Sequence, residues 1–188
     1  RSGRLHPDAK KLLGSSRLLD GTGLRVLAPE DMVLHVAAHV FQDGDVAGGQ
    51  RDLCDLDDLL RHFARDETFW NRLLDRAGEM ELGRPLWYGL GAVNRHLRTP
   101  LPAWVRDVSR TSRPPGPVDG LMRRLIDRAV EAQDPDHPRA ACSLAQTALY
   151  VRAHWLRMPL RLLLPHLARK ALRRYYQEEE EVEDGEAT

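Results

Sequence analysis

Two helical segments joined by a glycine-rich stretch constrain the fold of this chain more than any other feature. The first runs from Pro29 to about Phe41, with acidic residues in its first turn, where the helix dipole favours negative charge. Glycines and aspartates at residues 43–49 interrupt the helical pattern. The second, residues 51–64, gathers its large apolar residues on one side of a helix: Leu53, Leu56, Leu59, Leu60 and Phe63. The sequence therefore predicts a hairpin of two helices.

The rest of the chain predicts a mostly α-helical, bundle-like domain with a small β-hairpin or sheet edge near the N-terminus. Further helices are expected at residues 7–13, 66–81, 83–97, around 104, and at 118–133, 137–156 and 158–176. Asp66 is the expected cap of the helix that follows it. Two short apolar runs, residues 17–19 and 24–27, flank a glycine-containing turn and predict the β element.

Changes of composition divide the chain into five parts. We expect the β element in residues 1–27, a helical subdomain in 28–112, a linker at 113–117, C-terminal helices in 118–176 and a disordered acidic tail at 177–188. Small or aromatic residues at helical positions are expected in the core, namely Cys54, Trp70, Trp87, Trp104 and Trp155.

Charge is balanced overall but unevenly distributed. The chain has 28 basic and 28 acidic residues, yet no aspartate or glutamate occurs at residues 137–177. A basic amphipathic segment at 158–176 is compatible with a membrane surface or a nucleic acid. We favour a last helix that packs on the core with its polar face solvated, because Pro159 and Pro165 interrupt the segment and an acidic tail follows it.

Cysteine usage and hydropathy predict a cytoplasmic protein. Cys54 and Cys142 are too few for a disulfide framework and lack the Cys-x-x-Cys spacing of metal sites. No apolar signal core and no apolar run long enough to cross a bilayer is present. The chain begins at Arg1 instead of methionine, so we expect a trimmed or partial chain.

The helical hairpin also concentrates the side chains able to do chemistry. His35 and His39 are four residues apart on one helix, and Arg51, Asp52 and Asp55 lie on the next. One interpretation is a divalent metal site of nitrogen and carboxylate ligands, although the general-base Glu of His-Glu-x-x-His is missing. The other is a hydrogen bond between a histidine and Asp52 or Asp55 across the hairpin, with an Arg51–Asp55 pair. Periodicity does not decide between them.

Five stretches stand out: Leu-Ala-Pro-Glu-Asp-Met-Val-Leu-His-Val-Ala-Ala-His at 27–39, Arg-Asp-Leu-Cys-Asp-Leu-Asp-Asp-Leu-Leu at 51–60, Phe69-Trp70, Gly83-Arg84-Pro85-Leu86, and Tyr-Val-Arg-Ala-His-Trp-Leu-Arg-Met-Pro at 150–159. Together they resemble the C-terminal helical half of the uncharacterised bacterial nucleotidyltransferase family. More distantly, Arg51-Asp52-x-x-Asp55 is similar to the Arg-Asp-x-x-Asp motif of abortive-infection and type IV toxin nucleotidyltransferases.

The resemblance implies roles for the same five residues. His35, His39 and Arg51 would contact a nucleotide or its acceptor, and Asp52 or Asp55 would act as a base or orienting carboxylate. Residues 17–27 would be the remaining edge of the family's catalytic sheet. Mg²⁺ and a nucleoside triphosphate would bind only together with an N-terminal half that carries a Gly-Ser turn and an Asp-x-Asp pair.

That catalytic half is missing from the sequence. Gly14-Ser15 is the only comparable dipeptide, and no Asp-x-Asp follows it at the family's distance. The pairs Asp43-x-Asp45 and Asp55-x-Asp57 fall in the glycine-rich joint and on a predicted helix. We therefore expect a nucleotide- or acceptor-facing wall that is inert alone and whose partners are the missing half and an unknown acceptor. A noncatalytic helical binding module and a metal-dependent hydrolase are the alternatives.

Overall fold

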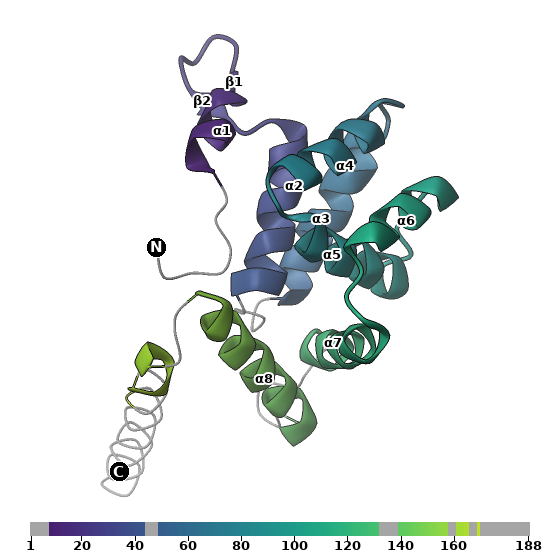
Figure 1. The fold of residues 1–188 in the computed structure, drawn as a ribbon. Coiled ribbons are helices and arrows are strands. Elements are labelled where there is room, and N and C mark those ends of the chain that lie inside the picture. Colours follow the sequence, from purple (N-terminus) through teal and green to yellow (C-terminus); the bar gives the residue numbers. More distant parts are fainter. Residues whose placement is uncertain (1–7, 44–48, 132–138, 158–160, 166–168, 170–188) are drawn as a thin grey trace, which may run out of the picture.

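The computed structural model describes residues 8–43, 49–131, 139–157, 161–165 and 169. Within these ranges the chain is mostly α-helical with one antiparallel pair of strands, which confirms the predicted fold class. The elements are α1 (Ala9–Gly14), β1 (Arg17–Leu18), β2 (Arg25–Val26), α2 (Pro29–Ala38), the π-helical turn η1 (His39–Asp43), α3 (Gly49–Phe63), α4 (Phe69–Glu79), α5 (Gly83–His96), α6 (Ala103–Ser109), the 3₁₀ turn η2 (Arg110–Ser112), α7 (Gly116–Ala129) and α8 (Ala140–Arg157). In Figure 1, α1 and the strands lie at one end of the molecule and α7 and α8 at the other.

The predicted N-terminal hairpin is confirmed. Arg17 pairs with Val26 and Leu18 pairs with Arg25. Gly21 and Gly23 adopt positive φ angles of 73° and 71° in the connecting turn, a conformation that favours glycine. The Leu19 amide donates to the carbonyl oxygen of Leu24 at 2.8 Å and closes the turn.

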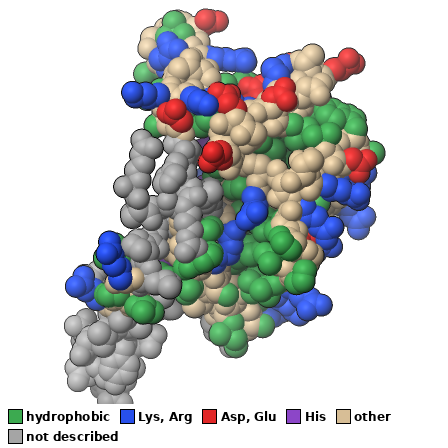
Figure 2. Space-filling view, in the orientation of Figure 1, with side chains coloured by type: hydrophobic (Ala, Val, Ile, Leu, Met, Phe, Trp, Pro, Cys, Tyr) green, Lys and Arg blue, Asp and Glu red, His purple; other side chains and the backbone are tan. Residues whose placement is uncertain are grey.

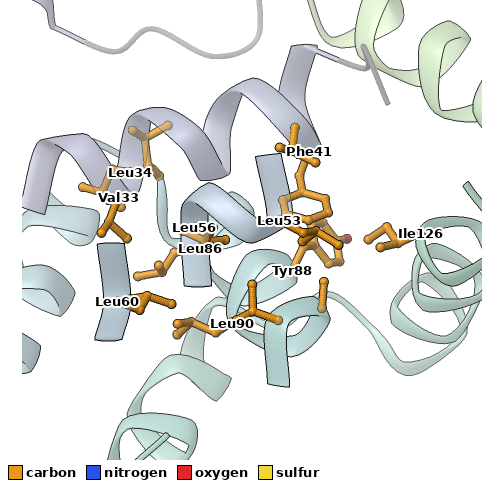
Figure 3. Packing of buried hydrophobic residues seen from close by; sticks show 14 of the residues in the cluster. Val33, Leu34, Phe41, Leu53, Leu56, Leu60, Leu86, Tyr88, Leu90 and Ile126 are labelled. Carbon is orange, nitrogen blue, oxygen red and sulfur yellow. The ribbon is translucent and has the colours of Figure 1, made fainter. Parts of the chain in front are cut away.

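The two central helices form the predicted hairpin and build the core. Helix α2 buries Val33, Leu34 and Ala37, while α3 buries Leu53, Leu56 and Leu60. Figure 3 shows these two helices meeting α5, which contributes Leu86, Tyr88 and Leu90 to the same core. The first helix ends as α2 at Ala38, and the π-helical turn η1 continues it to Asp43.

Gly89 on α5 lies where α5 crosses both helices of the hairpin. A Cβ at this position would lie 3.1 Å from Leu56 Cδ2 on α3, 3.4 Å from Phe41 Cε2 in η1 and 3.5 Å from Ala37 Cβ on α2. The missing side chain therefore permits a close approach of α5 to α2 and α3.

Several local predictions were wrong because helical spacing identifies a face without showing what covers it. Trp104 is 41% exposed and Trp155 is 39% exposed, so neither is a core anchor, and Cys54 is also exposed. Thr68 precedes α4, while Asp66 accepts hydrogen bonds from the Thr68 amide at 2.9 Å and the Thr68 hydroxyl at 2.7 Å. Asp66 therefore orders the turn before α4 and is not its N-cap.

The C-terminal predictions are tested only in part. Gly116 and Pro117, expected in the linker, form the start of α7. Of residues 158–176, residues 161–165 and 169 are described, and the acidic stretch 177–188 lies outside the described residues. In the described part of the chain, no helix has both the length and the apolar character needed to traverse a bilayer.

Candidate functional site: a groove between helices α2 and α3

The first turn of α2 carries two buried acids, Glu30 and Asp31, which are 6% and 2% exposed. Arg76 on α4 donates from Nε to Asp31 Oδ1 at 2.7 Å and from Nη2 to Asp31 Oδ2 at 3.0 Å. Ser15, at the end of α1, donates its hydroxyl to Asp31 Oδ2 at 2.5 Å. Because the hydrogen bonds to Asp31 favour the charged form, the pKa of Arg76 is raised.

Arg72, one turn before Arg76, pairs with the other acid. Its Nε donates to Glu30 Oε1 at 2.6 Å, and its Nη2 donates to Asp66 Oδ2 at 3.0 Å. Hydrogen bonds from Thr68 and Arg72 lower the pKa of Asp66 to about 2, and the bond to Glu30, followed by that to Asp66, raises the pKa of Arg72.

This charge network, formed by Ser15, Glu30, Asp31, Asp66, Arg72 and Arg76, joins α1, α2 and α4. In Figure 2, acidic and basic side chains lie next to one another where the N-terminal hairpin region meets the helical body. A cavity of about 480 Å³ adjoins the network, but Glu30 Oε1 and both carboxylate oxygens of Asp31 already accept hydrogen bonds from arginines. We therefore assign the network a structural role. From their place in the first turn of the helix, Glu30 and Asp31 were predicted to interact with the helix dipole only.

A larger concavity of about 670 Å³ lies between α2 and α3. We call it the α2–α3 groove, and its lining residues are Leu27, Met32, His35, Val36, Asp55, Asp58, Leu59 and His62. Residues 55, 58, 59 and 62 are spaced so that they share one face of α3. The groove brings together two of the five predicted site residues, His35 and Asp55, and adds Asp58 and His62, which the sequence analysis missed.

The other three predicted residues lie outside the groove lining. The His39 ring stacks on that of His35, with ring centroids 6.5 Å apart and an interplanar angle of 15°, as their spacing of four residues predicts. Arg51 is exposed and Asp52 partly buried in the first turn of α3. Among the described residues, no hydrogen bond joins His35 to Asp52 or Asp55, and no ion pair joins Arg51 to Asp55. The expected hydrogen bond across the helical hairpin is therefore not formed by His35.

The described residues do not fit a metal centre. They contain no group of three or more histidine, cysteine, aspartate or glutamate side chains arranged to hold a metal ion. Asp57, in the Asp55-x-Asp57 pair, accepts from Arg61 Nε at 2.8 Å and from the Thr99 hydroxyl at 2.6 Å. Asp57 is thus held by other side chains and is not part of the groove lining.

A second structural cluster surrounds the buried Asp119 on α7. Trp87 Nε1 donates to Asp119 Oδ1 at 2.8 Å, and Arg113 Nε donates to Asp119 Oδ2 at 2.9 Å. Burial raises the pKa of Asp119, but the hydrogen bonds from Trp87 and Arg113 outweigh burial and lower it overall. The cluster connects α5 to α7, and the partly buried Trp87 also packs against the hydrophobic core.

The fold and the groove define a mostly α-helical protein with a concave site between two adjacent helices. The chain belongs to the family described as uncharacterised nucleotidyltransferase, whose model matches residues 1–98 of the 188. This match includes the charge network and the α2–α3 groove, and it ends before the resembling block at 150–159. Neither the search of curated proteins nor the search of solved structures found a match.

Proposed function

We propose that this chain is the helical portion of a nucleotidyltransferase-like protein and that the α2–α3 groove forms the wall facing the nucleotide or its acceptor. The observation that carries the proposal is a groove of about 670 Å³, inside the region matched by the family, that unites His35 with Asp55. Its volume lies within the range of small-molecule sites, and its polar groups converge on an apolar floor.

The groove residues suit the acceptor side of a transfer reaction. Asp55 and Asp58 present carboxylates able to take a proton from an acceptor hydroxyl, and His35 presents an imidazole that can orient it. His39 and Arg51 lie on the same helical hairpin and are proposed to contact the nucleotide beside the groove, with Asp52 as an alternative orienting carboxylate.

Transfer in this proposal requires a catalytic sheet with a Gly-Ser turn and an Asp-x-Asp pair. Ser15 of Gly14-Ser15 hydrogen-bonds Asp31, and Asp57 is held by Arg61 and Thr99, so neither supplies that chemistry. The described residues do not fit the two-magnesium site of such a sheet, and we assign no step through magnesium to them. A cytoplasmic, nucleotide-binding assembly is the setting that we propose.

A direct test compares residues 1–188 with a protein that also carries the Gly-Ser and Asp-x-Asp block, found by reading the coding sequence upstream of residue 1. Binding of ATP and release of pyrophosphate are measured for both. We expect pyrophosphate release from the longer protein alone, and at least tenfold slower release when it carries Asp55→Asn.

The exposed residue Asp107 on α6, changed to Asn in the longer protein, is the matched control and should leave the rate unchanged. Equal activity of residues 1–188 and the longer protein would contradict the requirement for a catalytic sheet. Equal activity of the Asp55→Asn and Asp107→Asn variants would contradict the role of the groove.

A noncatalytic binding module is the second candidate. Ser15 and Asp57 belong to the dipeptide and the pair that are most similar in sequence to the Gly-Ser and Asp-x-Asp motifs. The observation that favours the binding module is that both residues already have structural partners. An upstream coding sequence that lacks both Gly-Ser and Asp-x-Asp would favour this candidate over the transferase.

A further inference from the structure

The charge of the α2–α3 groove indicates which of the two reactants it takes. Asp55 and Asp58 supply two carboxylates, and no lysine or arginine occurs among the described residues that line it. A nucleotide presents a triphosphate of high negative charge, which two nearby carboxylates repel where no metal ion lies between them, and the described residues contain no cluster arranged to hold one. The groove is therefore unsuited to the phosphates of a nucleotide.

The two carboxylates are also free to meet a ligand. Within the described part of the chain, neither Asp55 nor Asp58 accepts a hydrogen bond from a side chain or forms an ion pair, and both are exposed. Asp57, between them in the sequence, differs because Arg61 and Thr99 hold it on another face of α3. The charge that α3 presents to the groove is thus not neutralised internally.

The floor of the groove is apolar. Leu27, Met32, Val36 and Leu59 line it together with the imidazoles of His35 and His62. An apolar floor beneath a carboxylate rim complements a molecule that joins a hydrocarbon or aromatic body to a positively charged group.

We propose that the α2–α3 groove binds the acceptor, and that the acceptor is an organic amine whose ammonium group meets Asp55 and Asp58 while its apolar body rests on Met32, Val36 and Leu59. This inference rests on the proposed function, which it deepens by assigning the groove to the acceptor instead of the nucleotide. The amine is one substituent of the acceptor: its ammonium positions the molecule, while a separate hydroxyl gives its proton to Asp55, attacks the α-phosphate of the nucleotide and receives the nucleotidyl group as pyrophosphate leaves.

The test uses residues 1–188 and two probes of the same shape, tryptamine and its neutral alcohol analogue tryptophol. Binding is followed by the NMR signals of the imidazole rings, assigned with His35→Gln and His62→Gln. We expect tryptamine to shift the His35 and His62 signals and to bind about threefold to thirtyfold more tightly than tryptophol, because each exposed ion pair adds a modest amount.

The variant Asp55→Asn/Asp58→Asn should abolish this preference. Asp20→Asn/Asp107→Asn is its control, since it removes the same charge from exposed positions in the β-hairpin and on α6, away from the groove. Circular dichroism establishes that both double variants are folded.

Equal affinity for the two probes, or binding of neither, would overturn the proposal, as would magnesium-free ATP that displaces tryptamine. ATP displacement would leave the groove as a nucleotide wall, so the proposed function would survive. If residues 1–188 prefer tryptamine but the longer protein releases no pyrophosphate, the transferase function is contradicted and the amine site is supported.

Discussion

Helix α2 carries two polar clusters that differ in how their charges are compensated. In its first turn, the buried acids Glu30 and Asp31 pair with Arg72 and Arg76 of α4. Further along the same helix, His35 faces Asp55 and Asp58 across a groove where neither carboxylate has an ion-pair partner among the described residues. The charges of the first cluster hold helices together, whereas the carboxylates of the second stay exposed to solvent.

Burial explains the difference between the two clusters. An ionised carboxylate removed from water is tolerated only when it is paired and hydrogen-bonded, which is the situation of Asp31. Exposed carboxylates remain hydrated and need no internal partner, which is the situation of Asp55 and Asp58. The two clusters should therefore respond differently when one charge is removed.

The largest effect is expected for Arg76→Met in the charge network. Asp31 would stay buried with no guanidinium, and the free energy of unfolding should fall by about 3 to 5 kcal/mol. Urea denaturation followed by circular dichroism measures this change. Arg106→Met on α6, where the arginine is exposed, should change the free energy by less than about 0.5 kcal/mol. Similar losses in the two variants would break the distinction between the clusters.

A smaller loss is expected for Glu30→Gln. The amide oxygen can still accept from Arg72, so the hydrogen bond is retained while its charge assistance is lost. We expect the free energy of unfolding to fall by about 1 to 2 kcal/mol in the same denaturation experiment. A loss as large as that of Arg76→Met would show that Glu30 and Asp31 are equally dependent on their arginines.

Acid should weaken the network through Asp66. Its pKa is lowered to about 2 in the folded protein, below the value of about 3.9 for an unfolded aspartate. Its stabilising contribution is therefore complete above pH 4 or so and is lost as the pH falls toward about 2. Asp66→Asn should flatten the dependence of the urea midpoint on pH in this window.

Thr68→Ala provides the matched comparison for Asp66. It keeps the carboxylate but removes the hydroxyl that donates to it, so the acid-sensitive window should move to higher pH. Identical pH profiles for the wild type and Asp66→Asn would show that Asp66 does not contribute to acid sensitivity.

The smallest effect on stability is expected in the groove. Asp55 and Asp58 are three residues apart on one helix face, and removing either charge relieves a like-charge repulsion worth a few tenths of a kcal/mol. Asp58→Asn should thus leave the free energy of unfolding within about 0.5 kcal/mol of the wild type or slightly above it. A loss above 1 kcal/mol or so would mean that the groove is structural, like the charge network.

Sequence periodicity predicted the helices of the core, the β-hairpin and a position for His35 and Asp55 on the same side of the α2–α3 hairpin, although no hydrogen bond joins the two in the described residues. Each of these follows from neighbours along one helix or across one short turn. The pairing of Glu30 with Arg72 and of Asp31 with Arg76 joins residues 42 and 45 positions apart, and depends on how α4 packs on α2. The spacing of Arg72 and Arg76 puts them on one face of α4, and Glu30 and Asp31 are adjacent on α2. This spacing is compatible with two ion pairs between the helices, but it does not show that these four residues are partners.

The groove was predicted only in part for a similar reason. Asp58 and His62 share the α3 face of Asp55, so their helical spacing was available in the sequence. Which of these residues face α2 depends on the crossing of the two helices, which no periodicity specifies. Arg51 and Asp52 lie only one turn before Asp55, yet they are not part of the groove lining.

Gly89 on α5 lies behind the two helices that form the walls of the groove. It touches α2 through Ala37 and α3 through Leu56, the two helices that form the groove walls, but it is not part of the lining itself. A methyl group added there would lie 3.1 Å from Leu56 Cδ2, so the Leu56 side chain on α3 would have to yield, whereas 3.5 Å from Ala37 Cβ on α2 is an ordinary contact distance. We therefore expect Gly89→Ala to act on the groove through Leu56 and α3, from a position outside the lining and without changing any lining side chain.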